Sequence, residues 1–351
     1  MSPPAETGGA GHPGHPEHPD APARAARVDR TLLDRADALL RDLPRTRVVR
    51  LPHPGIRLYA KMESENRTGS AKDRAAIWIL REAVRRGDIT RDTTVVESSS
   101  GNFALSLASF LNELGVPFVP VLDPNVNAAT ERTLRRLCAR VEKVTEPDGT
   151  GGYLLSRLDR VARLRAELPD VYWPDQYANP DGARGHYELT AGELLADVGR
   201  IDYLFVGVGT GATVNGLSHR LGKEQPDALV IAVDVEGSAI FGAPPARRLI
   251  PGIGSSIRPP LVDAAWIGKV VVLSERDEVA GCRALLQDHG IYAGGSTGCV
   301  YAAITRHFEG HSGPEPVVAF LCADNGEPYA ETVYADDWVA AHLTPVATKG
   351  A

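Results

Sequence analysis

The amino-acid sequence predicts an α/β fold with two domains, each a mostly parallel β-sheet covered by helices, preceded by a disordered N-terminal tail. Helical and extended patterns alternate along most of the chain, which is typical of parallel sheets with helices on both faces. Residues 270–273 and 317–321 are continuously apolar, as expected of strands buried on both faces. The chain has 351 residues, which fits about two domains of ordinary size.

The predicted elements follow the hydrophobic periodicity along the chain. A first helix covers residues 31–40 and ends before Pro44, and a longer helix starts near Lys72 and ends at Gly87. Further helices are expected over residues 102–114, up to about 134, and over 153–168, and each later strand lies next to a helical segment. The predicted strands are residues 47–51, 56–62, 94–97, 118–122, 141–144, 203–208, 229–235, 270–273 and 317–322.

Domain boundaries are predicted from the order of the elements, because no internal repeat and no long linker follows the tail. The irregular stretch 173–185 is the weakest seam in the pattern. We therefore predict a smaller domain over residues 63–184 and a larger domain made of residues 29–62 and 185–345.

Residues 1–28 form the predicted tail. Residues 1–24 are rich in proline, glycine, histidine and alanine, and they lack the apolar segment of a secretion signal. The His-Pro pairs at His12, His15 and His18 offer metal ligands, but their proline-rich spacing favours solvated disorder. We predict no metal site.

Composition and charge disfavour several functional classes. The chain is 43% hydrophobic and 24% charged, within the range of soluble globular proteins. Its formal net charge of -7 disfavours general affinity for nucleic acids, and no apolar run approaches the ~20 residues that span a bilayer. We therefore expect a soluble, cytoplasmic protein. Its four cysteines lack the paired spacing of a zinc or redox site and are expected to be reduced, packed thiols: Cys138, Cys282, Cys299 and Cys322.

Three turns rich in glycine and hydroxyl residues follow predicted strands and lead into helices. Ligands of open α/β sheets bind at such turns, beyond the carboxyl ends of the strands. The turn 97–102 can hold a carboxylate through hydroxyls and N–H groups, and the turn 207–213 has consecutive amides that suit a phosphate. The third turn is 294–298. Each alone is equally well explained by close packing, but together they favour a ligand site.

Two common nucleotide motifs do not explain these turns. No Gly-Lys-Ser/Thr follows the glycines, as a P-loop requires. The turn 207–213 lacks the full glycine pattern of a dinucleotide site, although Asp234 lies at a plausible distance downstream. Hydride transfer is therefore a weak alternative.

Lys72 is the candidate catalytic residue. It follows a Gly-Ser turn at the predicted start of a helix, where backbone N–H groups disfavour its charge, lower its pKa and favour imine chemistry. A lone lysine in such a place is usually a solvated surface residue. The surrounding segment 66–74, NRTGSAKDR, favours the catalytic interpretation.

This segment, followed by Ser-Gly-Asn at 100–102 and Gly-Thr-Gly-Ala-Thr at 209–213, resembles the cysteine synthase and cystathionine β-synthase branch of fold-type II pyridoxal-phosphate (PLP) enzymes. The resemblance extends over about residues 31–339. It implies that Lys72 binds PLP covalently and that Asn102 hydrogen-bonds the ring hydroxyl oxygen. It also implies a phosphate cradle and a loop that closes on the substrate carboxylate; the cradle is Gly209, Thr210, Gly211, Ala212 and Thr213, and the loop is Ser98, Ser99, Ser100 and Gly101.

Other segments resemble the members of this family that join an activated serine to glutamate on the route to 2,3-diaminopropionate, for siderophores or peptide antibiotics. This implies O-phospho-L-serine and L-glutamate as substrates, with Arg157, Gln176 and Tyr177 as candidates for binding them. A guanidinium suits both phosphate and carboxylate groups. Arg157 is equally well explained as part of a solvated helix face with Arg160 and Arg163. The segments are 146–148, 151–154, 176–179, 237–242, 251–255 and 293–298.

Three positions differ from the cysteine synthases. Arg67 stands where proline is common, so the loop before Lys72 is looser or gains a cation, and Ala212 replaces a glycine. Asp324 stands where serine usually lies beside the pyridine nitrogen, as in the diaminopropionate enzymes, and a carboxylate there favours a protonated ring. Alternatively, Asp324 is a turn residue before Asn-Gly.

The resemblance implies β-replacement in two stages, with Lys72 removing and returning the α-proton while glutamate replaces phosphate. A cysteine synthase that uses sulfide is the nearest alternative, and a serine or threonine dehydratase is weaker. A non-catalytic PLP-binding scaffold in a biosynthetic complex is an alternative of another class. Family likeness also implies a homodimer with small amino-acid substrates and no nucleic-acid or membrane partner.

Overall fold

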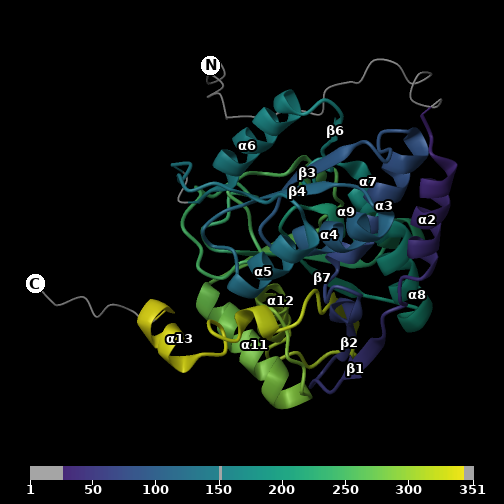
Figure 1. The fold of residues 1–351 in the computed structure, drawn as a ribbon. Helices are drawn as coiled ribbons and strands as arrows, with labels where there is room; N and C mark the ends of the chain where they lie inside the picture. The colour runs from purple at the N-terminus through teal and green to yellow at the C-terminus, as the bar shows by residue number, and fades with distance from the viewer. Residues whose placement is uncertain (1–26, 150–151, 344–351) are drawn as a thin grey trace, which may run out of the picture.

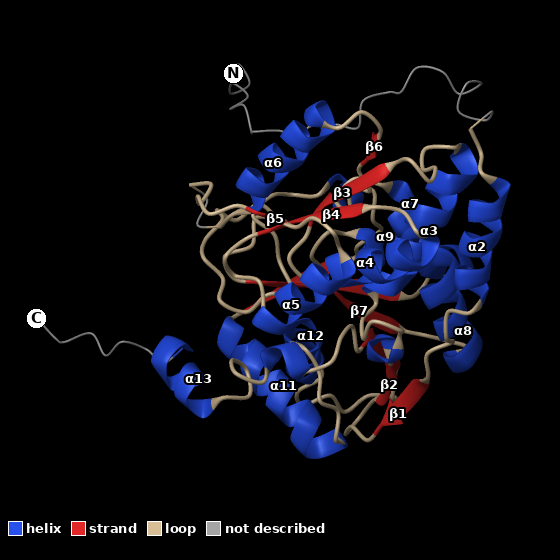
Figure 2. Cartoon of the chain, in the orientation of Figure 1, coloured by secondary structure: helices blue, strands red, loops and turns tan. Residues whose placement is uncertain are grey.

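The computed structural model describes residues 27–149 and 152–343, which form two β-sheets enclosed by helices (Figure 1). The predicted α/β fold class is confirmed. Most of the predicted tail, residues 1–26, lies outside the described residues. Figure 2 shows the strands in two separate groups, each flanked by helices.

The larger sheet has six strands in the order β1-β2-β10-β7-β8-β9. Neighbouring strands are parallel, except that β1 pairs antiparallel with β2. Parallel neighbours need crossover connections, and helices supply them here. The strands are β1 (Val48–Leu51), β2 (Arg57–Lys61), β7 (Tyr203–Gly207), β8 (Leu229–Val235), β9 (Lys269–Leu273) and β10 (Val317–Leu321).

Both faces of this sheet are apolar. Along β7, Phe205 packs in the layer under α11 and α12, while Leu204 and Val206 pack under α8 and α9. Successive residues of a strand face opposite sides, so a strand covered on both sides must be apolar throughout. The covering helices are α8 (Gly192–Val198), α9 (Ala212–Glu224), α10 (Pro260–Asp263), α11 (Glu275–His289) and α12 (Gly295–His307), with α13 (Asp336–Leu343) following β10.

The smaller sheet has four parallel strands in the order β5-β4-β3-β6. Val95 of β3 packs under α2, α3, α4 and α5, and Val96 packs under α6 on the opposite face. The strands are β3 (Thr94–Ser98), β4 (Phe118–Leu122), β5 (Glu142–Lys143) and β6 (Val171–Tyr172). The helices are α2 (Arg30–Arg41), α3 (Lys72–Arg86), α4 (Asn102–Leu114), α5 (Ala128–Leu137) and α6 (Leu154–Glu167).

The prediction that residues 270–273 are buried on both faces is wrong. They lie in β9, which pairs only with β8 and forms the edge of the larger sheet. Val270 is 38% exposed and Val272 is 50% exposed. The matching prediction for 317–321 is confirmed, because β10 lies inside the sheet and all its residues are buried.

The stretch 173–185 is not irregular throughout. Its second half is α7 (Pro180–Gly185), which continues through a π-helical turn (His186–Ala191) into α8. Glycine normally argues against a helix. Here Gly185 allows close packing, since a Cβ atom at this position would lie 2.6 Å from the carbonyl oxygen of Arg74 in α3. The domain limits at residues 63 and 184 stay a prediction.

The four cysteines are buried and unpaired, as predicted. Burial raises the pKa of each thiol, to about 12 for Cys138 and Cys322. Within residues 27–149 and 152–343, no helix is both long and apolar enough to span a bilayer.

Candidate active site

The loops that follow β3, β7 and β10 meet around Lys72, at the carboxyl ends of strands from both sheets. This is the edge at which open parallel sheets bind ligands. A small cavity here brings together four predicted site residues, namely Lys72, Gln176, Thr210 and Ala212. Its other lining residues are Ala75, Ile79, Phe103, Gly182 and His186.

Lys72 is the first residue of α3, and the turn before it is tied to the loop after β10. The Ala71 N–H donates to the Ala323 carbonyl at 2.8 Å, and Ser70 forms a short antiparallel bridge with Asp324. Burial lowers the pKa of Lys72, and the nearby carboxyl of Asp324 opposes this shift. A lowered pKa leaves more of the amine neutral, as an imine-forming nucleophile requires.

Asp324 is held through one carboxyl oxygen only. Its Oδ2 accepts hydrogen bonds from Asn102 Nδ2 at 2.8 Å and from the Tyr329 hydroxyl at 3.0 Å. Its Oδ1 is buried without a hydrogen-bond partner among the described residues. Burial raises the pKa of Asp324, while the bonds from Asn102 and Tyr329 and the charge of Lys72 lower it. At 4% exposed, Asp324 is not a solvated turn residue, and its free oxygen suits a protonated pyridine nitrogen.

Asn102 starts α4, directly after Gly101. The sequence predicts a hydrogen bond from Asn102 to the cofactor's ring hydroxyl oxygen, whereas in the structure its amide donates to Asp324. Asn102 therefore lies beside the group that fits the ring nitrogen. Its contact with a ring hydroxyl stays a prediction.

The turn 209–213 has the properties of a phosphate cradle. Its N–H groups donate no hydrogen bond to any described residue, and they lie at the start of α9, where the helix dipole favours an anion. Gly211 has a φ of 93°, and a Cβ atom there would lie 2.8 Å from the Val262 side chain. Thr213 Oγ1 lies 3.2 Å from His186 Nε2.

The loop 98–101 leaves hydrogen-bonding groups available. The Ser98 carbonyl accepts a bond from Gln176 Nε2 at 3.0 Å, whereas the Ser98 hydroxyl is buried and has no partner among the described residues. Ser99 Oγ accepts an N–H from the first turn of α4 at 3.2 Å. No atom lies within 4 Å of the position that a Cβ atom would take at Gly101. A substrate carboxylate can therefore approach this backbone closely.

Arg157 points from α6 to this loop. Its Nη1 donates to Ser100 Oγ at 3.1 Å, and its Nε lies 3.3 Å from Asp123 Oδ2. Its side chain is 13% exposed, so Arg157 does not belong to a solvated helix face. Burial raises the pKa of the Tyr177 hydroxyl, and the positive charge of Arg157 lowers it. The structure thus places Arg157, Gln176 and Tyr177 beside the loop, and their roles in binding stay a prediction.

His186 is a site residue that sequence reasoning missed. It lies in the π-helical turn after α7, where π-helices are often associated with function. Its ring bridges Thr213 at 3.2 Å and Thr190 at 3.0 Å. Burial lowers its pKa to about 3, and the charges of Lys72 and Arg74 act in the same direction. The ring is therefore neutral, and a single histidine beside a glycine gave no sequence signal for this role.

A network of buried ion pairs behind Lys72 was also missed. Arg74 donates to Glu63 Oε2 at 3.1 Å and to Glu193 Oε1 and Oε2 at 2.9 Å. Lys61 donates to Glu193 Oε2 at 2.6 Å and to the Thr46 carbonyl at 2.7 Å. Four separate segments supply these groups, so no local pattern identifies them.

Glu97 lies in the predicted turn 97–102, immediately before the loop 98–101, but the sequence analysis gave it no role. It is fully buried, and its Oε1 accepts the Ser98 N–H at 2.8 Å while Oε2 has no partner among the described residues. Burial and the neighbouring carboxyl of Asp175 raise the pKa of Glu97 to about 8. The loop thus begins at a carboxyl group that is mostly protonated at neutral pH.

Arg67 and Ala212, the other two positions that differ from the cysteine synthases, have different surroundings. Arg67 forms an ion pair with Glu113 and lies 5.7 Å from the Phe110 ring centroid, so its cation is directed to α4. Ala212 lines the Lys72 cavity and is buried with Ala183 and Leu261. The extra methyl group is thus accommodated by packing next to α7.

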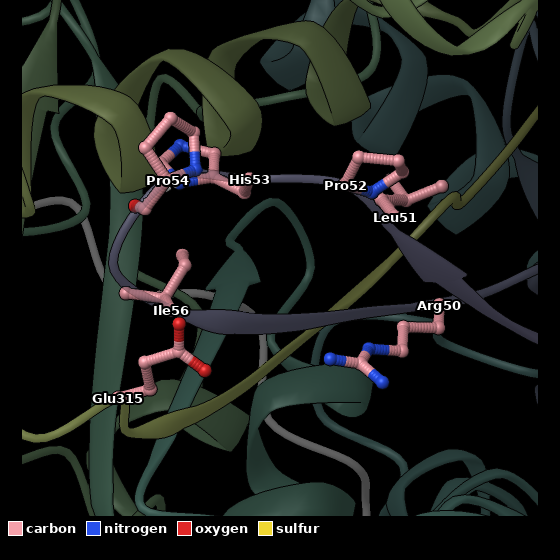
Figure 3. A pocket seen from close by; sticks show the side chains of 7 residues that line it. All are labelled: Arg50, Leu51, Pro52, His53, Pro54, Ile56 and Glu315. Carbon is pink, nitrogen blue, oxygen red and sulfur yellow. Dashed lines mark hydrogen bonds between the residues drawn. The ribbon is translucent and has the colours of Figure 1, made fainter.

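A separate cavity of about 440 Å³ lies at the β1–β2 hairpin (Figure 3). Arg50, His53 and Glu315 are among its lining residues, and it shares none with the Lys72 cavity. It contains no predicted site residue. The larger cavity is therefore not where the candidate chemistry lies.

Comparisons with known proteins identify the family. A family model described as pyridoxal-phosphate dependent enzyme matches residues 39–323. The chain is 40% identical over 284 residues to the N-(2-amino-2-carboxyethyl)-L-glutamate synthase of Ralstonia nicotianae, covering 81% of this chain and 84% of that protein.

Solved structures agree with this result. An O-acetylserine dependent cystathionine β-synthase from Helicobacter pylori superposes with a TM-score of 0.77 at 25% identity, covering 85% of this chain and 97% of that one. An O-ureido-L-serine synthase superposes with a TM-score of 0.76 at 26% identity, covering 89% and 96%.

The residues present fit PLP. The free Oδ1 of Asp324 matches a ring nitrogen, the free amides of 209–213 match a phosphate, and the lowered pKa of Lys72 matches an imine-forming amine. Together with the family match, these features show that PLP is the cofactor. The chain therefore belongs to the family of pyridoxal-phosphate dependent enzymes.

Proposed function

We propose that this enzyme replaces the phosphate of O-phospho-L-serine with the amino group of L-glutamate, giving N-(2-amino-2-carboxyethyl)-L-glutamate and phosphate. The observation that carries the proposal is the 40% identity, over 81% of the chain, to a synthase named for that product. The reaction would serve the synthesis of 2,3-diaminopropionate for a siderophore or a peptide antibiotic.

Bound PLP would supply an aldehyde for imine formation and a ring that withdraws electrons from the α-carbon. In this proposal Lys72 holds the cofactor, then removes the α-proton as its freed amine and later returns a proton. Its lowered pKa supports the role, because a neutral amine can act as base and as nucleophile. Asp324 would hold a proton on the ring nitrogen through Oδ1, while Asn102 and Tyr329 fix Oδ2.

The loop 98–101 would bind the carboxylate of O-phospho-L-serine. Ser98 supports this role with a buried hydroxyl that has no protein partner within the described residues. Arg157, Gln176 and Tyr177 would position the loop and the first substrate, since Arg157 bonds Ser100 and Gln176 bonds the Ser98 carbonyl. Each contact ties the loop to an element outside α4.

The bond changes balance without an added oxidant or reductant. The Cβ–O bond to phosphate breaks and carries its electron pair away with phosphate. A bond from the glutamate nitrogen to Cβ forms, and the nitrogen loses one proton. No nucleophilic side chain is required between the two stages, because the amine itself takes the place of phosphate.

A cysteine synthase activity, with sulfide as nucleophile, is the second candidate. The fold similarity to an O-acetylserine dependent cystathionine β-synthase favours it. Asp324 in place of the serine that is usual in cysteine synthases disfavours it.

We further propose that the enzyme is a cytoplasmic homodimer. Light scattering of the purified protein tests the oligomeric state.

The test supplies purified, PLP-loaded enzyme with O-phospho-L-serine or O-acetyl-L-serine and with glutamate, glutamine or sulfide in every combination. We expect the glutamate adduct, identified by mass, to form fastest from O-phospho-L-serine. Cysteine as product, with no glutamate adduct, would replace the proposal by the second candidate. An inert protein that still binds PLP would indicate a scaffold.

A further inference from the structure

We infer that Arg248 binds the side-chain carboxylate of the amine substrate and thereby selects an acidic amino acid as the nucleophile. The inference deepens the proposed function and rests on it. Arg248 lies in the long connection 236–259 between β8 and α10. The sequence drew attention to the glycine-rich segments on either side of Arg248 and not to the arginine itself.

The connection 236–259 brings Arg248 to the edge of the candidate active site. A Cβ atom at Gly254 would lie 3.2 Å from Arg248 Nε, and the Gly254 N–H donates to the Val208 carbonyl at 2.8 Å. A Cβ atom at Gly209 would in turn lie 3.7 Å from the Gly252 carbonyl oxygen. The segment 252–254 therefore lies close both to Arg248 and to the phosphate cradle.

The Arg248 guanidinium is only partly satisfied. Its Nη1 donates to the Gly237 carbonyl at 2.6 Å, but Arg248 forms no ion pair with any described carboxylate. A guanidinium has five N–H donors and binds a carboxylate best through two of them at once. The side chain is half-buried, so it is screened less than a surface arginine and is still open to a ligand.

The nearby acidic groups stabilise this charge only from a distance, and none of those in the described residues forms an ion pair with it. Glu275 Oε1 already accepts the N–H groups of Leu249 and Ile250, at 2.5 and 2.7 Å. Burial raises the pKa of Asp234 and, more strongly, of Glu278. Burial lowers the pKa of Arg248 in spite of these neighbours. An anionic ligand would supply the missing partner.

Two arginines near the site would bind different substrates. Arg157, from the smaller sheet, is already bonded to Ser100 and Asp123 beside the loop proposed for the first substrate. Arg248, from the larger sheet, has no hydrogen bond to that loop. Burial raises the pKa of Tyr177, and the positive charges of both arginines lower it. An amine substrate that enters after phosphate leaves would thus find its anion partner in Arg248.

The experiment compares PLP-loaded wild type with Arg248→Gln, Arg248→Lys and the neighbouring Arg247→Gln, because Arg247 is exposed. The first stage is followed with O-phospho-L-serine alone, by phosphate release and by the absorbance of the bound cofactor. The second stage is followed with glutamate and, separately, with glutamine, which has the same length without the charge.

We expect Arg248→Gln to raise the KM for glutamate roughly 10- to 100-fold, the range for losing a hydrogen bond to a charged group. The KM for glutamine and the rate of the first stage should stay within about 2-fold, a margin well below the loss of one hydrogen bond. The preference for glutamate over glutamine should therefore collapse. Arg248→Lys should retain part of it, and Arg247→Gln should behave like wild type.

An unchanged KM for glutamate in Arg248→Gln would overturn the inference. Equal slowing of the first stage would also overturn it, since Arg248 would then hold O-phospho-L-serine. If Arg248→Gln does not retain PLP, Arg248→Lys decides, because it keeps a charge but loses the planar pair of donors. A wild-type enzyme that forms no glutamate adduct would instead refute the proposed function, and the inference with it.

Discussion

Two groups of buried charges lie next to each other at the start of α3, and they differ in how completely they are paired. Behind the helix, Arg74 is held by Glu63 and Glu193. In front, Lys72 forms no ion pair within the described residues, and Asp324 keeps an oxygen without a partner. Since an unpaired buried charge is unfavourable, it persists only where a ligand supplies the partner. At the start of α3, the paired charges therefore belong to the scaffold and the unpaired ones belong to the candidate site.

The largest expected effect is that of Lys72→Ala on turnover. Loss of the base and of the covalent link should lower the rate at least ~10³-fold. The free energy of unfolding of the cofactor-free protein should not fall, because a desolvated amine that forms no ion pair is removed. Product analysis and urea unfolding measure the two effects. A variant with a tenth of wild-type activity would contradict the role of Lys72.

Arg74→Met should instead lower the free energy of unfolding. Removing one partner leaves Glu63 and Glu193 buried with less compensation, which destabilises the fold by about 3–5 kcal/mol. Urea unfolding of the cofactor-free protein measures this loss. Arg81→Met, on the same helix, is the control, because Arg81 pairs with Asp37 near the surface and should contribute about 1 kcal/mol or less. Equal losses in the two variants would remove the distinction between the two groups of charges.

Asp324→Asn tests the unpaired group directly. Without a carboxylate to hold a proton on the ring nitrogen, we expect the rate to fall roughly 10- to 100-fold. The absorbance of the bound cofactor should shift as well. Tyr329→Phe, which removes one bond to Asp324 Oδ2, should reduce the rate less, by about 10-fold at most. If the two substitutions act equally, the charge of Asp324 is not what matters.

The smallest expected effect is the change in the free energy of unfolding per pH unit that is due to Glu97. Burial raises its pKa from 4.5 to about 8, so the folded chain binds more protons than the unfolded chain between these values. Its contribution to stability is complete below about pH 4.5 and is lost as the pH rises to about 8, by at most ~1.4 kcal/mol per pH unit. Glu97→Gln should remove this slope. Unfolding free energies at about pH 6 and about pH 8 test it, and identical slopes in both proteins would contradict it.

Local sequence patterns predicted many of the regular elements well. Residues 229–235 and 102–114 form β8 and α4 with the predicted limits, because apolar periodicity and terminal glycine are local signals. Local patterns gave the wrong burial for residues 270–273 and did not predict the helix α7. An apolar run does not show whether a strand lies at an edge, and glycines inside α7 reflect close contact with α3.

Glycine-rich turns after strands indicated a ligand site, and the resemblance of the segments around Lys72, Asn102 and 209–213 to PLP enzymes pointed to the cofactor, because backbone amides and a nucleophilic amine are properties of short segments. The tertiary structure alone decided which charges remain unpaired. Pairing depends on distances between segments far apart in the chain, such as Asp324 and Asn102 or Arg74 and Glu193. Arg248 appears as one more arginine in the sequence, and only the fold shows that it lies beside the site without an ion pair to any described carboxylate.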